Sequence, residues 1–433
     1  MIRRHIFTLL TVFSIGALLG TQVPAHAQRV SDKDIVEAYQ YMLGRWLVLR
    51  QETLDLKDGM KWNEVTHREV GGVAWANPNL DVAYSEAWIA VDDTSCTLVT
   101  LPEIKGRYYT VQVLNGWGEV TANINERNFP KHPSGTFGLC LKGARVTLPA
   151  GTQRIDLPNK KSRVLMRVEL GADPAQAVAL QKQITMKPTG NPKVEDTVVR
   201  FDFANNKLPG VEAFDQTEAI LEVEPDINRG MRKLQRRSRA VAKAATDPKE
   251  RAKIDAIIRE QAIPAFEAAV LHPGPVKNDW IHPRIFGNYA NDYQMRSVVN
   301  LVGIWANNAK EAVYFGVIGL DGSRTYIQTY PKSELPSSKA QYFWSVIAVD
   351  GEKYQVIPNS LNRYLLNKQS ALQFNPDGSL TLAFAPKLPA GISQSNWLPT
   401  PEGKRYNMTY RFYGPSKDVA GGKYYPPALV VRQ

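Results

Sequence analysis

The feature that most constrains this chain is the division of its strand-like sequence into two blocks, with helical periodicity before and between them. In the first block, from about Trp75 to Leu170, short alternating runs are separated by Gly, Pro and Asn. The clearest strands there are residues 87–91, 107–113 and 162–168. Several short strands at this spacing predict a β-sandwich. The second block has strand-like runs at 312–318, 324–330, 342–350, 379–385 and 406–413.

Apolar residues at helical spacing predict an opening helix over 32–50, capped by Ser31 or Asp32, and further helices at 173–183, 220–269 and 291–307. The predicted fold class is therefore α+β, mainly β. The predicted division of the chain is a signal peptide (1–27), an N-terminal helix and lead-in (28–70), an N-terminal β-sandwich (71–185), a basic helical middle segment (186–285) and a C-terminal β-domain (286–433).

Composition excludes several classes of protein. The 433 residues are 43% hydrophobic and 22% charged, which fits a globular protein and excludes disorder, a collagen-like fibre and a multi-span membrane protein. No fixed-period repeat is present, which disfavours a propeller or solenoid.

The N-terminus has the three parts of a secretory signal peptide. A basic start, Met1–Arg4, precedes an uncharged apolar stretch, Ile6–Gly20, and then Val23–Gln28 with alanines suited to cleavage after Ala27. The alternative is an uncleaved anchor, but the stretch is shorter than the roughly 20 residues of a membrane span. We therefore expect a periplasmic or secreted protein. Export would place Cys96 and Cys140 in an oxidising compartment, where they could form a disulfide or remain two buried thiols.

Several blocks of sequence resemble known families. Asn79–Ser85 followed by Trp88, then Gly106–Tyr109, Ser134–Phe137 and Leu148–Gly151, resemble the bacterial domain of unknown function 1254. The blocks that resemble its companion, domain of unknown function 1214, are Tyr342–Ser345, Asn362–Tyr364, Asn375–Ser379, Asn396–Pro399 and Arg411–Pro415. This resemblance implies an immunoglobulin-like N-terminal sandwich, a small helical middle part and a jelly-roll-like C-terminal sandwich. It implies no settled activity, and Val82 replaces a family Thr.

Sequence motifs give no established chemistry. The four histidines beyond the signal lack metalloprotease spacing, and there is no Cys-x-x-Cys, nucleophile elbow or dinucleotide-binding fingerprint, so no metal or cofactor is predicted. An atypical hydrolase site is one hypothesis, with Asp81, Tyr84, Ser85 and Arg363 as candidate catalytic residues. Asp81 and Ser85 would share a strand face, whereas turn formation by Asn79 and Asp81 is the structural alternative.

Two pairs of carboxylates could serve as acid and base: Asp81 with Glu86, or Asp292 with Glu311. Asp292 and Arg296 are spaced for an ion pair on a helix surface.

Aromatic residues provide a second hypothesis, ligand binding. Trp117 between two glycines and Trp397 in turn-like sequence are predicted to be exposed and to contact a small molecule or polysaccharide, with Asn79 and Arg363 as polar partners. Trp88 and Trp344 lie in apolar strands and are predicted core residues. The sequence thus favours an exported ligand-binding or envelope-associated accessory protein with a groove between two β-domains; the alternative is the exported hydrolase.

The positive charge is concentrated in one segment. The formal net charge is +11, and removing Arg3 and Arg4 leaves +9. Residues 228–253 contain ten basic and two acidic residues. Arg229, Arg232, Arg236, Arg239 and Lys243 recur at helical spacing and predict a basic stripe, which is either a solvated helix face or a contact with an anionic envelope surface. Export excludes nucleic acid as a partner, and nothing fixes an oligomeric state.

Overall fold

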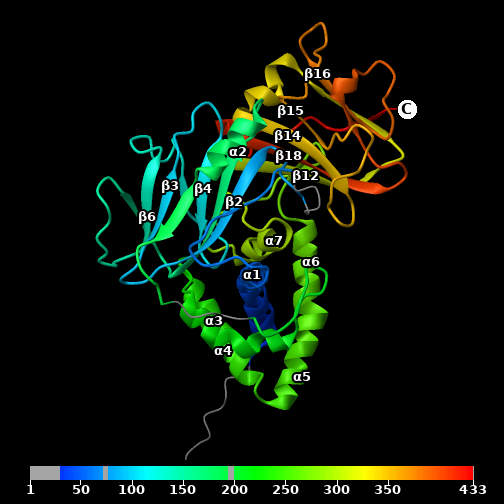
Figure 1. The fold of residues 1–433 in the computed structure, drawn as a ribbon. Helices are drawn as coiled ribbons and strands as arrows, with labels where there is room; N and C mark the ends of the chain where they lie inside the picture. The colour runs from blue at the N-terminus through cyan, green and yellow to red at the C-terminus, as the bar shows by residue number, and fades with distance from the viewer. Residues whose placement is uncertain (1–29, 72–76, 194–198, 433) are drawn as a thin grey trace, which may run out of the picture.

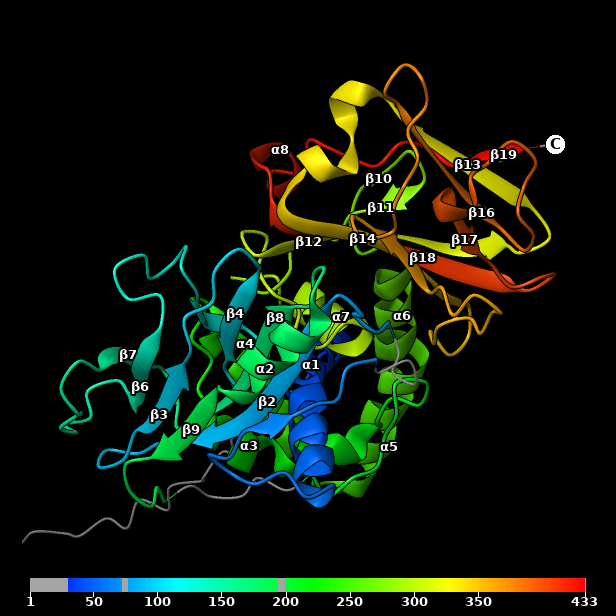
Figure 2. The same ribbon diagram turned by 45° about the horizontal axis from the view of Figure 1, so that its top comes forward.

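The computed structural model describes residues 30–71, 77–193 and 199–432, and the predicted signal peptide lies outside them. The described residues form an α+β protein, mainly β, with 19 strands and eight α-helices. Two β-sandwiches and a group of helices make three adjoining bodies (Figures 1 and 2). No helix in the described ranges is long and apolar enough to cross a membrane.

The N-terminal sandwich packs a five-stranded sheet against a four-stranded sheet. The first sheet has the order β1 (Thr66–His67), β2 (Val82–Ala90), β8 (Lys161–Glu169), β4 (Tyr109–Leu114), β5 (Val120–Ile124). The second has the order β7 (Gln153–Leu157), β6 (Gly135–Leu141), β3 (Thr97–Leu101), β9 (Thr185–Pro188). Alternate residues such as Ala87, Val164 and Phe137 fill the core between the sheets. A disulfide joins Cys96 and Cys140 at the ends of β3 and β6, and α2 (Pro174–Lys182) follows β8.

The C-terminal sandwich has a six-stranded and a four-stranded sheet. The first has the order β10 (Val276–Lys277), β11 (Trp280–Ile281), β12 (Ala312–Asp321), β18 (Arg405–Pro415), β14 (Ala340–Asp350), β15 (Leu365–Asn367). The second has the order β17 (Trp397–Pro399), β16 (Leu380–Ala385), β13 (Thr325–Tyr330), β19 (Val430–Arg432). A short helix, α8 (Lys417–Ala420), follows β18. Tyr410 of β18 packs edge-on against Tyr330 of β13, joining the two sheets through the core.

The helices form the body below the sandwiches in Figure 1. They are α1 (Asp32–Lys57), α3 (Thr217–Val223), α4 (Met231–Ala244), α5 (Pro248–Ile257), α6 (Ile263–Leu271) and α7 (Tyr293–Val302). Ser31 caps α1 in a capping box, as one of the two predicted caps. α1 is buried along most of its length and packs on α7, where Gly44 lies against Ser297. The helices therefore belong to the same core as the C-terminal sandwich.

Candidate functional site: the cleft between the sandwiches

The site lies where the five-stranded N-terminal sheet faces the six-stranded C-terminal sheet. Alternation along β8 directs Arg163, Arg167 and Glu169 to one side of the sheet. All three are 5% exposed or less. Arg163 is covered by α1 and the rings of Trp88 and Trp305, whereas the C-terminal sheet lies across the junction from the Glu169 end of the strand (Figure 2). A polar sheet face is thus buried.

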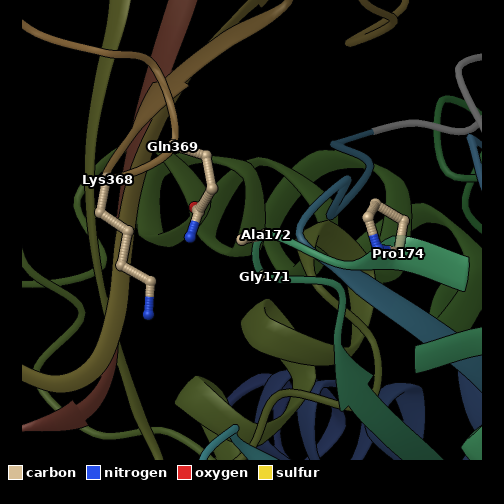
Figure 3. Close-up of a pocket in the computed structure, with 5 residues that line it drawn as sticks. All are labelled: Gly171, Ala172, Pro174, Lys368 and Gln369. Carbon is tan, nitrogen blue, oxygen red and sulfur yellow. The ribbon is translucent and has the colours of Figure 1, made fainter. Parts of the chain in front are cut away.

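Two adjoining hollows open at the edge of this junction. The inner hollow has a volume of about 190 Å³ and the outer, more open one about 580 Å³. Figure 3 shows the outer hollow, with Gly171, Ala172 and Pro174 on the N-terminal side and Lys368 and Gln369 on the C-terminal side. The inner hollow is lined by Leu80, Asp81, Glu169, Leu170, Gly171, Pro174, Phe343, Asn367 and Gln369. The outer hollow is within the size range of clefts that hold small ligands, roughly 300–1,000 Å³.

Asp81 is the acidic group of the inner hollow whose hydrogen bonding is incomplete. The Asn79 side chain accepts a hydrogen bond from the Asp81 backbone N–H at 3.0 Å. This bond forms the turn that the sequence offered as the structural alternative to a catalytic role. Asn367 Nδ2 donates to Asp81 Oδ1 at 2.8 Å, whereas Oδ2 has no hydrogen-bond partner among the described residues. Burial raises the pKa of Asp81, although the neighbouring side chains of Ser345 and Asn367 and the charge of Arg411 oppose the shift. Asp81 is therefore a buried acceptor with unused capacity.

Glu169, the second carboxylate of the inner hollow, is held on two sides. The Tyr108 backbone N–H donates to its Oε2 at 2.8 Å, and Lys368 Nζ lies 2.8 Å from its Oε1. Lys368 also donates to the Tyr342 carbonyl at 2.6 Å. The charge of the Glu169 carboxylate is thus compensated by a lysine from the opposite domain.

Behind the hollows, a network of tyrosines and arginines fills the junction. Tyr413 from β18 accepts a hydrogen bond from Asn79 Nδ2 at 2.8 Å, and its ring stacks on Phe343 with centroids 4.4 Å apart. Tyr108 donates to Glu311 at 3.0 Å. Arg167 forms no ion pair with a carboxylate within the described residues; it donates to the side chain of Gln112 and the carbonyl of Trp305. These contacts fix the sheets that form the walls of the cleft.

The structure does not bring the four candidate catalytic residues together. Tyr84 and Ser85 are consecutive in β2 and so point to opposite sheet faces. Ser85 is 1% exposed and lies 2.7 Å from His67 Nδ1, whereas Asp81 precedes the strand and contacts Asn367. The prediction that Asp81 and Ser85 share a face is therefore wrong.

Arg363 lies beside Trp397. Its guanidinium donates to the carbonyls of Gln394 and Trp397, the latter at 3.0 Å. Trp397 is partly buried and donates its indole N–H to the Ala385 carbonyl at 2.8 Å. Both residues thus stabilise the C-terminal sandwich in this structure, and neither lines the hollows.

The predicted exposure of Trp117 is wrong. Its side chain is fully buried, its indole N–H donates to the Glu224 carbonyl at 3.0 Å, and the Arg296 guanidinium lies 4.4 Å from its ring centroid. The flanking glycines serve close packing instead of exposure, since a Cβ on Gly116 would lie 2.6 Å from the Glu224 side chain. Trp88 and Trp344 are core residues, as predicted.

Neither predicted carboxylate pair is assembled. Glu86 pairs with Arg68 and Arg163, and Glu311 pairs with Arg127. Asp292 pairs with Arg284 at 2.8 Å, so the predicted surface pair of Asp292 with Arg296 is also wrong.

Arg296 is instead a buried residue, 2.9 Å from Asp226. The pairing could not be read from helical spacing, because Asp226 comes from a distant segment.

Sequence reasoning missed Glu169, Asn367, Lys368 and Gln369. The alternation of charged residues in β8 was a signal for a polar sheet face, but Asn367 to Gln369 form a turn without a motif. In the described parts of the chain, no group of three or more His, Cys, Asp or Glu residues is arranged to hold a metal ion.

The fold and the cleft define a class of two-domain β-proteins with a helical body. Residues 62–188 match DUF1254, a protein family of unknown function, and residues 318–417 match DUF1214, another protein family of unknown function. The two matches stand in the order expected from the sequence, DUF1254 first and DUF1214 second.

Solved structures that are similar to the chain include the following two. The VPA0106 protein from Vibrio parahaemolyticus aligns with a TM-score of 0.65 and 16% identity, covering 93% of this chain and 100% of that chain, which shows a shared fold. An uncharacterised protein from Burkholderia cenocepacia aligns with a TM-score of 0.46 and 12% identity over 93% of this chain and 95% of that chain. No curated protein matches the chain.

Proposed function

We propose that this chain is an exported protein that binds a small, hydroxyl-bearing ligand in the cleft between its two sandwiches. The observation that carries the proposal is Asp81: a carboxylate 6% exposed, lining the inner hollow, with Oδ2 lacking a hydrogen-bond partner among the described residues. A buried acceptor without a partner carries a desolvation cost of about 1–3 kcal/mol. Oδ2 is itself buried, so a ligand hydroxyl that reaches it and donates to it would remove that cost.

The rest of the cleft supports a polar, uncharged ligand. Asn367 and Gln369 contribute amides, and the charge of Glu169 is already compensated by Lys368. Phe343 and Leu80 provide apolar surface for the carbon skeleton of a sugar or polyol.

Export is supported by the N-terminal sequence and by the disulfide. Met1–Arg4, Ile6–Gly20 and the alanines before Gln28 fit a cleaved signal. The Cys96–Cys140 bond fits an oxidising compartment. Expression of the full chain in a Gram-negative host should yield periplasmic protein that begins at Gln28; cytoplasmic protein that retains Met1 would contradict export.

To test ligand binding, the purified protein is mixed with each compound of a panel of monosaccharides, oligosaccharides and polyols. Binding is measured by thermal shift and by calorimetric titration. At least one compound should raise the melting temperature of the wild type. Asp81→Asn removes the charge and replaces one carboxylate oxygen by an amide, and should lose that binding while remaining folded. The matched control is Asp93→Asn, at an exposed aspartate, which should bind as the wild type does. No ligand in the panel, or full binding by Asp81→Asn, would contradict the proposal.

The second candidate is a hydrolase that uses Asp81 as a general acid. It is favoured by the raised pKa of Asp81, which keeps the carboxyl protonated to higher pH, and by a second carboxylate, Glu169, in the same hollow. Chromogenic ester, glycoside and phosphoester substrates test it. Turnover lost in Asp81→Asn but retained in Asp93→Asn would favour the hydrolase, whereas ligand binding without turnover would favour the binding protein.

A further inference from the structure

The outward face of α4, together with Arg229 just before the helix, carries a cluster of unpaired positive charges, which we call the basic face. Its members are exposed Arg229, Arg232, Lys233, Arg236 and Lys243. Across the described ranges, none of the five has a carboxylate within ion-pair distance. The opposite side of the helix, with Met231, Leu234 and Val241, is buried against the helical core.

Other arginines nearby have a different role. Arg237 is paired with Asp34 and Glu37 of α1, and Arg239 with Glu218 of α3. Pairing of these two attaches α4 to its neighbours. The predicted basic stripe therefore changes in two residues: Arg239 is neutralised by Glu218, and exposed Lys233 belongs to the basic face instead.

An exposed apolar side chain immediately precedes the basic face in the sequence. Ile227, 45% exposed, is two residues before Arg229 in the segment that leads into α4. Figure 1 places α4 at the lower end of the molecule, away from β14 and β15. A surface with clustered cations and an exposed isoleucine at its border matches an anionic interface with an apolar layer beneath the charges.

We propose that the basic face docks this protein onto the surface of an anionic phospholipid bilayer. Arg229, Arg232, Lys233, Arg236 and Lys243 contact the headgroups, and Ile227 enters the boundary between headgroups and acyl chains. Lipid is favoured over an acidic polysaccharide because a soluble polyanion would offer nothing to Ile227. The proposal concerns a surface separate from the cleft and stands independently of its ligand.

The test is sedimentation of the purified protein with vesicles of one part phosphatidylglycerol to two parts phosphatidylcholine, and with pure phosphatidylcholine. The wild type should bind the anionic vesicles only, and high salt should release it, because exposed charges are screened within about 10 Å at 0.1 M salt. The variant Arg232→Gln/Lys233→Gln/Arg236→Gln keeps good helix formers on an exposed face. Its affinity should fall about a hundredfold, at roughly fivefold for each charge.

The matched control removes the same charge elsewhere. Lys131, Lys142 and Arg145 are exposed on the N-terminal sandwich, and the variant Lys131→Gln/Lys142→Gln/Arg145→Gln should bind nearly as the wild type does. Equal losses in both triple variants would mean that net charge, not the basic face, causes binding, and would overturn the proposal. So would an absence of binding by the wild type.

Ile227→Ser separates lipid from a soluble polyanion. It should weaken vesicle binding severalfold and leave retention on dextran sulfate unchanged. Vesicle binding that is unaffected by Ile227→Ser, together with tight retention on dextran sulfate, would show polyanion binding and overturn the commitment to a bilayer.

Discussion

The disulfide of the N-terminal sandwich gives a prediction whose size follows from the topology. Cys96 and Cys140 are 44 residues apart in sequence, and they sit next to the paired residues Thr97 and Leu139 of β3 and β6. Closing a loop of this length restricts the unfolded chain by about 4 kcal/mol at 25 °C in the chain-entropy model. Breaking the bond should therefore destabilise the sandwich by up to about that amount.

The shift in melting temperature also reports which part of the molecule unfolds together. Unfolding entropy is about 2.1 cal/mol/K for each residue. If the N-terminal sandwich of residues 66–188 unfolds alone, a loss of about 4 kcal/mol lowers its melting temperature by roughly 15 °C. If the described chain unfolds as one unit, the same loss spreads over about three times as many residues, and the drop is about 5 °C.

The assay compares oxidised and reduced wild type by calorimetry and urea unfolding, because reduction leaves every other side chain unchanged. Cys96→Ala/Cys140→Ala is the control, and its melting temperature should not respond to reductant. Since both cysteines are fully buried, this variant also loses packing and should be no more stable than the reduced wild type. A loss below about 1 kcal/mol on reduction would refute the loop-closure reasoning.

Two further predictions concern the buried charges of the helical body. Arg296→Met leaves Asp226 buried without its partner and should lower the free energy of unfolding in urea by about 3–5 kcal/mol. Arg284→Met breaks a more exposed pair and should lower it by under about 1 kcal/mol. Equal losses in the two variants would contradict the burial argument. Burial raises the pKa of Glu224 to about 7, against the opposing effect of Arg45, so the fold favours the neutral acid. That stabilisation is complete below the pKa of the unfolded state and is lost as pH rises through about 7, which lowers the free energy of unfolding by about 3 kcal/mol. Glu224→Gln should remove this pH-dependent decrease. Parallel curves of unfolding free energy for wild type and variant from pH 5 to 8 would contradict the prediction.

The strands and helices were largely predictable, because their signals are local. Alternation over 162–168 found β8, and helical spacing from 32 found α1 with its Ser31 cap. The predicted strand 87–91 covers only the end of β2, which begins at Val82. The earlier half of β2, Val82–Glu86, mixes apolar and polar residues without regular alternation, so its strand signal is weak until its partner strand β8 is known.

The candidate site was predictable only in part, because its partners come from distant segments. Asp81 stood out within a sequence block, but its contact with Asn367 spans 286 residues. Trp117 shows the opposite error: its glycine neighbours suggested an exposed turn, whereas Gly118, with φ of 78°, allows Asn300 to approach within hydrogen-bonding distance of the Trp117 carbonyl. Glycine marks a close approach as readily as an open turn, and sequence alone does not say which.

The placement of the two proposed surfaces has a consequence for how the protein would act at a membrane. The basic face lies on α4 at the helical end of the molecule, and the cleft lies near α2 and β15 at the other end in Figure 1. Paired Arg237 and Arg239 fix α4 to α1 and α3, and α1 packs on α7, which precedes β12 of the C-terminal sandwich. Docking through α4 would therefore hold the cleft away from the lipid, open to ligands in the surrounding solution. It follows that anionic vesicles should leave ligand affinity nearly unchanged, and a strong loss of ligand binding on vesicles would contradict this orientation.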